Sequence, residues 1–276
     1  MVLPNRFVKM AGGGNDFLVF EADGRRLKEA DRREIALLCR RGLSVGADGA
    51  LFVSGGGDGA VRLDYFNSDG SLASFCANGT RCAARYVARR GLASAQGPTI
   101  ETGWGMIRSR VSGEEVTLFL PAFPAPGSPI GITEEGLPST ATPMDVGVPH
   151  LVVFVTRDLD RLDIARLAPP LRRHPALPEG ANVDFVQVVS PDRISVRTFE
   201  RGIEGETLAC GSGVVAAAVE AVRQRRVAPP VACGTRSGVD FVVSFQEKEG
   251  MMTDVTLTGD AREIYAGELA PDAAKP

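Results

Sequence analysis

The stretch that decides the fold is Cys76-Ala-Asn-Gly79, because it returns later in the chain as Cys210-Gly-Ser-Gly213. The positions of the two cysteines differ by 210 − 76 = 134. Each follows an apolar run that ends in a polar turn, and each precedes an alanine-rich stretch with high helix propensity. The pattern therefore predicts a strand, a turn and a helix in both places, with the cysteine where the helix begins.

Two further segments repeat at the same spacing. Residues 10–20 align without gaps with residues 144–154, and Gly46 aligns with Gly180, so that 144 − 10 and 180 − 46 both equal 134. Coincidence among common residues is the alternative, but the cysteine pair does not consist of common residues. The repetition therefore predicts two copies of one fold.

Short apolar or β-branched runs near Gly, Asp, Asn or Pro predict a chain made mostly of strands. The expected strands are 17–21, 50–54, 61–66, 116–120, 151–156, 184–189, 194–199, 241–245 and 255–258, and the expected helices are 31–41, 80–90 and 213–224. Residues 121–143 are rich in Pro, Gly, Ser and Thr and are typical of a connector. We therefore expect an N-terminal half over residues 1–120 and a C-terminal half over residues 121–261.

The composition excludes several classes of protein. With 44% hydrophobic residues and a net charge of −3 over 276 residues, the chain is neither disordered nor, with five cysteines, a small disulfide-stapled fold. Lys and Arg (31) do not outnumber Asp and Glu (34), so a nucleic-acid partner is not expected. The sequence contains neither a run of apolar residues of transmembrane length nor a signal peptide, which predicts a cytoplasmic protein without a membrane partner and with reduced cysteines.

No cofactor or metal is expected from the motifs. The sequence contains no GxGxxG after a predicted strand and no Walker-type loop. The spacing of Cys76 and Cys82 does not fit a zinc site, and the chain has only two histidines.

A cysteine at the start of a helix suggests a particular chemistry. The first N–H groups of a helix have no partner within it, and the helix dipole adds partial positive charge there. A carboxylate could be held by the N–H groups of Ala77 and Asn78 in one copy and of Gly211 and Ser212 in the other. The same environment is expected to lower the pKa of the adjacent thiol.

Two such thiols on opposite sides of one substrate predict epimerisation at an α-carbon. One thiolate would remove the α-proton from one face, and the opposite thiol would deliver a proton to the other face. The negative charge of the carbanion would spread onto the bound carboxylate. The sequence thus indicates a small amino-acid substrate and Cys76 and Cys210 as the base and acid.

Six motifs resemble those of the diaminopimelate epimerase family, which is a cofactor-independent two-cysteine family of lysine and peptidoglycan-precursor biosynthesis. They are GNDF (14–17), NSDGS (67–71), CANGTRC (76–82), VGVPH (146–150), GANVDF (180–185) and ERGIEGETLACGSG (200–213).

The resemblance implies more about fold and site. It implies an α+β fold of two pseudo-symmetric halves, each a mostly antiparallel, barrel-like sheet around a central helix, with residues 262–276 completing the first half. It implies a homodimer that interconverts LL- and meso-2,6-diaminopimelate. The substrate-binding residues would be Asn15, Asn67, Asn182, Glu200 and Arg201, while His150 and Glu200 would assist the thiols as catalytic residues.

Val148 departs from the family pattern, in which an asparagine that contacts the substrate is usual at this position. Two alternatives therefore stay open beside diaminopimelate epimerisation. One is a related cofactor-independent racemase or epimerase for another amino acid, and the other is a non-catalytic amino-acid-binding homologue.

Overall fold

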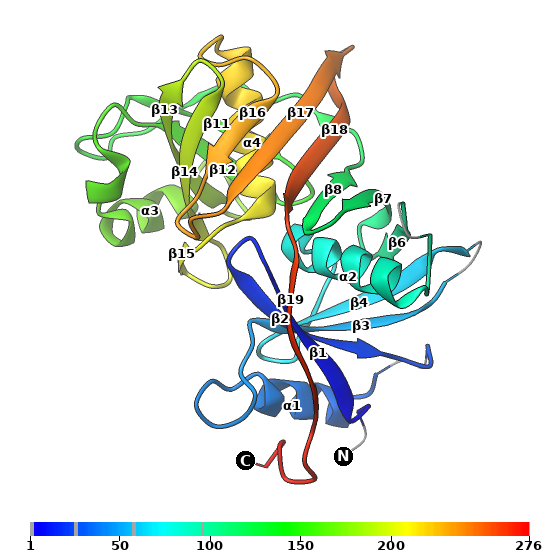
Figure 1. Ribbon diagram of the computed structural model, residues 1–276. Helices are drawn as coiled ribbons and strands as arrows, with labels where there is room; N and C mark the ends of the chain where they lie inside the picture. Colours follow the sequence, from blue (N-terminus) through cyan, green and yellow to red (C-terminus); the bar gives the residue numbers. More distant parts are fainter. Residues whose placement is uncertain (1–2, 25–26, 57–58, 95–96, 276) are drawn as a thin grey trace. The chain divides into compact units, whose positions relative to one another are not determined.

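The computed structural model describes residues 3–24, 27–56, 59–94 and 97–275 (Figure 1). The chain forms two compact units. The first comprises Met1–Phe119 and Gly259–Pro276, and the second comprises Leu120–Thr258. The expected halves, 1–120 with 262–276 and 121–261, include residues 1–2, 25–26, 57–58, 95–96 and 276, which lie outside the described residues. The fold is mixed α+β with many more strands than helices.

The first unit begins with a strand hairpin and is completed by a strand from the end of the chain. Its elements are β1 (Arg6–Gly12), β2 (Asn15–Glu21), α1 (Glu29–Leu38), β3 (Gly49–Gly55), β4 (Val61–Asn67), β5 (Leu72–Ala73), α2 (Ala77–Arg90), β6 (Thr99–Thr102), β7 (Gly105–Ser112), β8 (Glu115–Phe119) and β19 (Arg262–Glu268). β19 pairs antiparallel with β1. The two strands of the first hairpin are joined by Gly13 and Gly14, both with positive φ, which glycine adopts without strain.

The second unit contains the remaining elements. They are β9 (Phe123–Pro124), β10 (Ile130–Gly131), β11 (Thr140–Asp145), β12 (Pro149–Phe154), a 3-10 turn η2 (Leu159–Arg161), α3 (Ile164–Arg172), β13 (Asn182–Ser190), β14 (Arg193–Glu200), β15 (Gly205–Thr207), α4 (Gly211–Arg223), β16 (Val231–Gly234), β17 (Asp240–Lys248) and β18 (Met251–Asp260).

Strand pairing follows the same order in both units. In the first, β1–β2 is antiparallel, β2–β3 parallel, β3–β4 and β4–β5 antiparallel, β4–β6 parallel, and β6–β7 and β7–β8 antiparallel. In the second, β11–β12 is antiparallel, β12–β13 parallel, β13–β14 and β14–β15 antiparallel, β14–β16 parallel, and β16–β17 and β17–β18 antiparallel. The register of the parallel pair repeats as well: Phe17 faces Gly49 and Leu151 faces Val183, so that 151 − 17 and 183 − 49 both equal 134.

One helix in each unit is almost entirely buried. Helix α2 is buried from Ala77 to Ala88 and contacts β1–β4, β6–β8 and β19. Helix α4 is buried over most of its length and contacts β11–β14, β16 and β17. Burial on many sides fits the many alanines of both helices, although α2 also buries the large side chains of Arg81, Arg85 and Tyr86.

The sequence-based prediction of elements was partly wrong. Helix α3 was not among the expected helices; it contains Pro169 and Pro170, and its apolar side chains Ile164, Leu167 and Leu171 are buried in the core of the second unit. The expected connector 121–143 contains the short strands β9 and β10 and the start of β11. None of the helices in the described part of the chain is long and apolar enough to cross a membrane.

Candidate functional site

Cys76 lies directly before α2, in the N-cap position. Its backbone is extended, and its sulfur accepts a hydrogen bond from the backbone N–H of Gly79 at 3.4 Å. The side chain is half-buried. A thiol at this position faces the unpaired N–H groups of the first helical turn, which include those of the buried residues Ala77 and Asn78.

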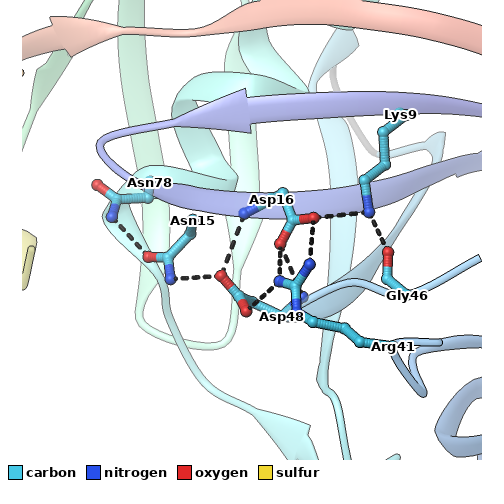
Figure 2. A network of polar contacts seen from close by, with 7 residues as sticks. All are labelled: Lys9, Asn15, Asp16, Arg41, Gly46, Asp48 and Asn78. Carbon is cyan, nitrogen blue, oxygen red and sulfur yellow. Dashed lines mark hydrogen bonds and ion pairs between the residues drawn. The ribbon is translucent and has the colours of Figure 1, made fainter. Parts of the chain in front are cut away.

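A chain of polar contacts runs from α2 to the hairpin of the first unit (Figure 2). The amide of Asn78 donates to Oδ1 of Asn15 at 2.7 Å, and the amide of Asn15 donates to Oδ2 of Asp48 at 3.0 Å. Asn15 is half-buried at the start of β2. The sequence had singled out both asparagines, and the structure brings them into direct contact.

Asn67 is the last residue of β4. Its backbone pairs with Ser71 across the turn 67–71, and its side-chain amide donates to Oγ of Ser71 at 3.0 Å. The turn keeps this amide half-buried at the strand end.

Cys210 occupies the corresponding position before α4. It is buried, and its sulfur lies 3.5 Å from Oγ of Ser212. Burial, followed by the negative charges of Glu200 and Asp184, raises the pKa of this thiol well above its usual value. The expectation of a lowered pKa at the helix start is therefore wrong for Cys210, because the loss of solvent outweighs the helix N–H groups.

His150 connects Ser212 to a buried carboxylate. Its Nδ1 lies 2.7 Å from Oδ2 of Asp184, and its Nε2 lies 2.9 Å from Oγ of Ser212. The other oxygen of Asp184 accepts a hydrogen bond from Thr198 at 2.7 Å. Because a carboxylate only accepts hydrogen bonds, Nδ1 of His150 donates to Asp184, and Nε2 is the ring nitrogen that faces Ser212.

Sequence reasoning missed Asp184. The signal was its position within GANVDF, two residues after Asn182, where a carboxylate stands between the apolar residues Val183 and Phe185. Strand β13 pairs in parallel with β12, and this pairing brings Asp184 alongside His150. Asp184 and His150 are both fully buried.

Three further predicted residues lie at the ends of β13 and β14. Burial raises the pKa of Glu200, which accepts a hydrogen bond from Thr207 at 2.6 Å. Oδ1 of Asn182 accepts from the backbone N–H of Arg201 at 2.8 Å. The guanidinium of Arg201 donates to the backbone oxygen of Glu179 at 3.0 Å and remains partly exposed.

Each unit thus gathers its own set of predicted residues. The first holds Cys76, Ala77, Asn78, Asn15 and Asn67, and the second holds Cys210, Gly211, Ser212, His150, Asn182, Glu200 and Arg201. All five cysteines are free, and burial raises the pKa of Cys39 and of Cys82 to about 12. Within the ranges that the structure describes, no cluster of three or more His, Cys, Asp or Glu residues could hold a metal ion.

Comparison with known proteins identifies a family whose members are similar to this chain over most of its length. The sequence profile of the diaminopimelate epimerase family matches residues 7–119 and 142–262. A diaminopimelate epimerase of Archaeoglobus fulgidus is 39% identical over 95% of this chain and 95% of its own length. One from Gemmatimonas aurantiaca is 38% identical over 96% of this chain and 99% of its own length.

Solved structures share the fold at lower identity. A probable proline racemase from Agrobacterium radiobacter superposes with a TM-score of 0.72 at 17% identity, covering 98% of this chain and 95% of its own. A phenazine biosynthesis protein of the PhzF family from Bacillus anthracis gives a TM-score of 0.70 at 19% identity, covering 96% of this chain and 98% of its own.

Proposed function

The chain belongs to the diaminopimelate epimerase family, and from this premise we propose that it interconverts LL- and meso-2,6-diaminopimelate by proton transfer at the α-carbon. It is an isomerase, and its place is in lysine and peptidoglycan-precursor biosynthesis. The observation that carries the proposal is the equivalent position of Cys76 and Cys210. Each is the residue before a buried helix in one of two units whose strands pair in the same order.

Cys76 and Cys210 are the proposed base and acid. One thiolate takes the α-proton as the C–H bond breaks, and the electron pair moves into the adjacent carboxylate. The other thiol then gives its proton to the opposite face, which inverts the configuration. The N–H groups of Ala77, Asn78, Gly211 and Ser212 stabilise the charge on the carboxylate, since each lies in the first turn of a helix.

The raised pKa of Cys210 gives it a defined resting state. A buried thiol with neighbouring carboxylates is protonated, and in that state it can donate a proton. In the reverse direction it must lose this proton. Ser212, His150 and Asp184 provide a route, because the hydroxyl of Ser212 can accept from the thiol while it donates to Nε2 of His150.

The second amino-acid end of diaminopimelate needs its own binding groups. Arg201 suits a carboxylate, and the amides of Asn15, Asn67 and Asn182 suit carboxylate and ammonium groups alike. The negative charge of Glu200 raises the pKa of Cys210 and so favours the protonated thiol, which is the state that donates the proton. Recognition of two polar ends would exclude ordinary amino acids, which leave these groups unpaired.

Val148 supports one alternative. Valine cannot form the hydrogen bond that an asparagine at this position would offer, so a related amino acid with a less polar distant end could be the substrate. A racemase or epimerase for such an amino acid would use the same two thiols.

The wider arrangement follows the family. We propose that the units are pseudo-symmetric copies, each a mostly antiparallel, barrel-like sheet around α2 or α4. We further propose that the protein acts in the cytoplasm as a homodimer without a cofactor.

Solvent isotope exchange tests the function. In D₂O the protein should place deuterium at an α-carbon of LL-diaminopimelate as the meso isomer forms. Activity on a monoamino acid with none on diaminopimelate would favour the alternative racemase. Binding of diaminopimelate without isotope exchange would instead identify a non-catalytic binding protein.

A further inference from the structure

We propose that Asp48 is a positioning residue that fixes the side-chain amide of Asn15, so that Asn15 presents an N–H donor to a carboxylate of the substrate. The inference rests on the proposed function, because Asn15 is a substrate-binding residue only there. It assigns Asp48 and its partner Arg41 a role that the sequence motifs do not give them.

The amides of Asn15 and Asn78 lie in one directed chain of hydrogen bonds. Arg81 donates to Oδ1 of Asn78 at 2.6 Å, Asn78 donates to Asn15 at 2.7 Å, and Asn15 donates to Asp48 at 3.0 Å. A cation therefore stands at one end and a carboxylate at the other. Arg81 is fully buried and Asn78 is 2% exposed, so solvent does not compete for the inner bonds.

This chain permits only one orientation of each amide. If the amide of Asn15 were flipped, its oxygen would face the carboxylate of Asp48 and its nitrogen would face the nitrogen of Asn78 (Figure 2). Both contacts would be repulsive, because acceptor would meet acceptor and donor would meet donor. The charges of Arg81 and Asp48 thus set the direction of the whole chain.

The fixed orientation decides what Asn15 can offer. Its nitrogen carries two N–H groups, of which one is directed to Asp48. Its oxygen already accepts from Asn78. Asn15 is half-buried, so its second N–H is available to a ligand, and a donor selects a carboxylate over an ammonium group.

Asp48 is itself firmly held. Its Oδ1 accepts from Arg41 at 2.7 Å, and its Oδ2 accepts from the backbone N–H of Asp16 at 3.2 Å as well as from Asn15. Arg41 also bonds to the carboxylate of Asp16, which pairs with Lys9 at 2.7 Å (Figure 2). Burial alone would raise the pKa of Asp16, but the bonds from Arg41 and Lys9 outweigh it and lower that pKa.

The change Asp48→Asn tests this role with little change in volume. Both oxygens of Asp48 accept, so an asparagine at position 48 must turn its NH₂ group against Arg41 or against Asn15 and the N–H of Asp16. We expect the KM for diaminopimelate to rise about tenfold, with kcat changed less than about twofold, because the lost contact binds the substrate equally in the ground state and the transition state. The matched control is Asp64→Asn, which breaks the ion pair of Asp64 with Arg62 at 2.9 Å on β4 of the same unit.

A double-mutant cycle separates positioning from a general structural effect. If Asp48 acts through Asn15, Asp48→Asn should have no further effect on kcat/KM in an Asn15→Ala background. Two effects that multiply fully, or an Asp48→Asn variant that behaves like Asp64→Asn, would overturn the proposal.

An NMR measurement does not depend on the activity. The two side-chain NH₂ signals of Asn15, assigned by their loss in Asn15→Ala, should move in Asp48→Asn and stay in place in Asp64→Asn. Unmoved signals would also overturn the proposal.

If Asp48→Asn does not fold, Arg41→Gln serves instead, since this largely exposed arginine pairs with Asp48 from the surface. If the proposed function itself were wrong, the wild-type protein would not exchange the α-hydrogen of diaminopimelate, which is a separate observation from the effects of these variants.

Discussion

Several ionisable side chains of the second unit lie where solvent is absent. Asp184 and His150 are fully buried, and Cys210 is 8% exposed. The sequence identified Cys210 and His150 from their motifs, but it could not reveal how much solvent each side chain loses. That loss reverses the expected direction of the pKa shift at Cys210. In the proposed mechanism, Ser212 and His150 are the route by which this thiol would lose its proton.

Asp184→Asn should lower the activity without preventing folding. The asparagine keeps the shape and can accept from Thr198 or from His150, but it no longer supplies the charge that fixes the proton on Nδ1 of His150. We expect kcat to fall by about a hundredfold, as for an impaired acid–base group. Steady-state kinetics measures this, with Asp192→Asn as the control, because it removes the charge of an exposed carboxylate that accepts a hydrogen bond from Ser190. Equal kcat values for the two variants would contradict the role of Asp184.

The buried thiols outside the proposed site should resist alkylation. Burial raises the pKa of Cys82 and of Cys39 to about 12, so at pH 8 about one thiol in ten thousand is ionised. Cys76 is half-buried and should be modified first by iodoacetamide. Mass spectrometry of the digested protein gives the order of labelling, and faster labelling of Cys82 than of Cys76 would disagree with the structure.

At the scale of elements, periodicity and turn residues predicted both buried helices and most of the long strands close to their observed positions, but not β7 (Gly105–Ser112). For example, the expected strand 61–66 corresponds to β4, and the expected helix 213–224 corresponds to α4. Strand β1 was not predicted because Lys9 interrupts its apolar pattern, yet Lys9 is buried through its pair with Asp16. Such tertiary pairing is not visible in a local pattern, and the same reason explains why Asp48 and Asp184 were missed.

The start of α4 depends on a close approach that only glycine allows. A Cβ atom on Gly213 would overlap Oδ1 of Asp184 and would lie 3.0 Å from Oγ1 of Thr198. Gly213→Ala should therefore lower the free energy of unfolding by about 2–3 kcal/mol, as overpacking does elsewhere. Urea unfolding measures the loss, and Gly131→Ala is the matched control because a Cβ atom there would meet open space. If both variants were equally stable, the close packing of α4 on Asp184 would be wrong.

At the scale of the whole molecule, the constant offset between the repeated segments corresponds to two compact units with one cysteine-capped helix each. The sequence reveals this repetition because the cysteines, glycines and strand patterns recur in order. Two-base epimerisation needs one group for each face of the α-carbon, and a repeated fold supplies two groups of matched chemistry. The remaining cysteines, Cys39, Cys82 and Cys233, are buried within the packing.

The most direct test of the account is epimerisation of LL-diaminopimelate in D₂O by Cys76→Ser and Cys210→Ser, with Cys39→Ser as the control. We expect both active-site variants to lose formation of the meso isomer by at least about a thousandfold, because a serine hydroxyl is a far weaker base than a thiolate at neutral pH. The control should retain the wild-type rate and deuterium incorporation. Wild-type epimerisation by either Cys76→Ser or Cys210→Ser would contradict the two-thiol mechanism.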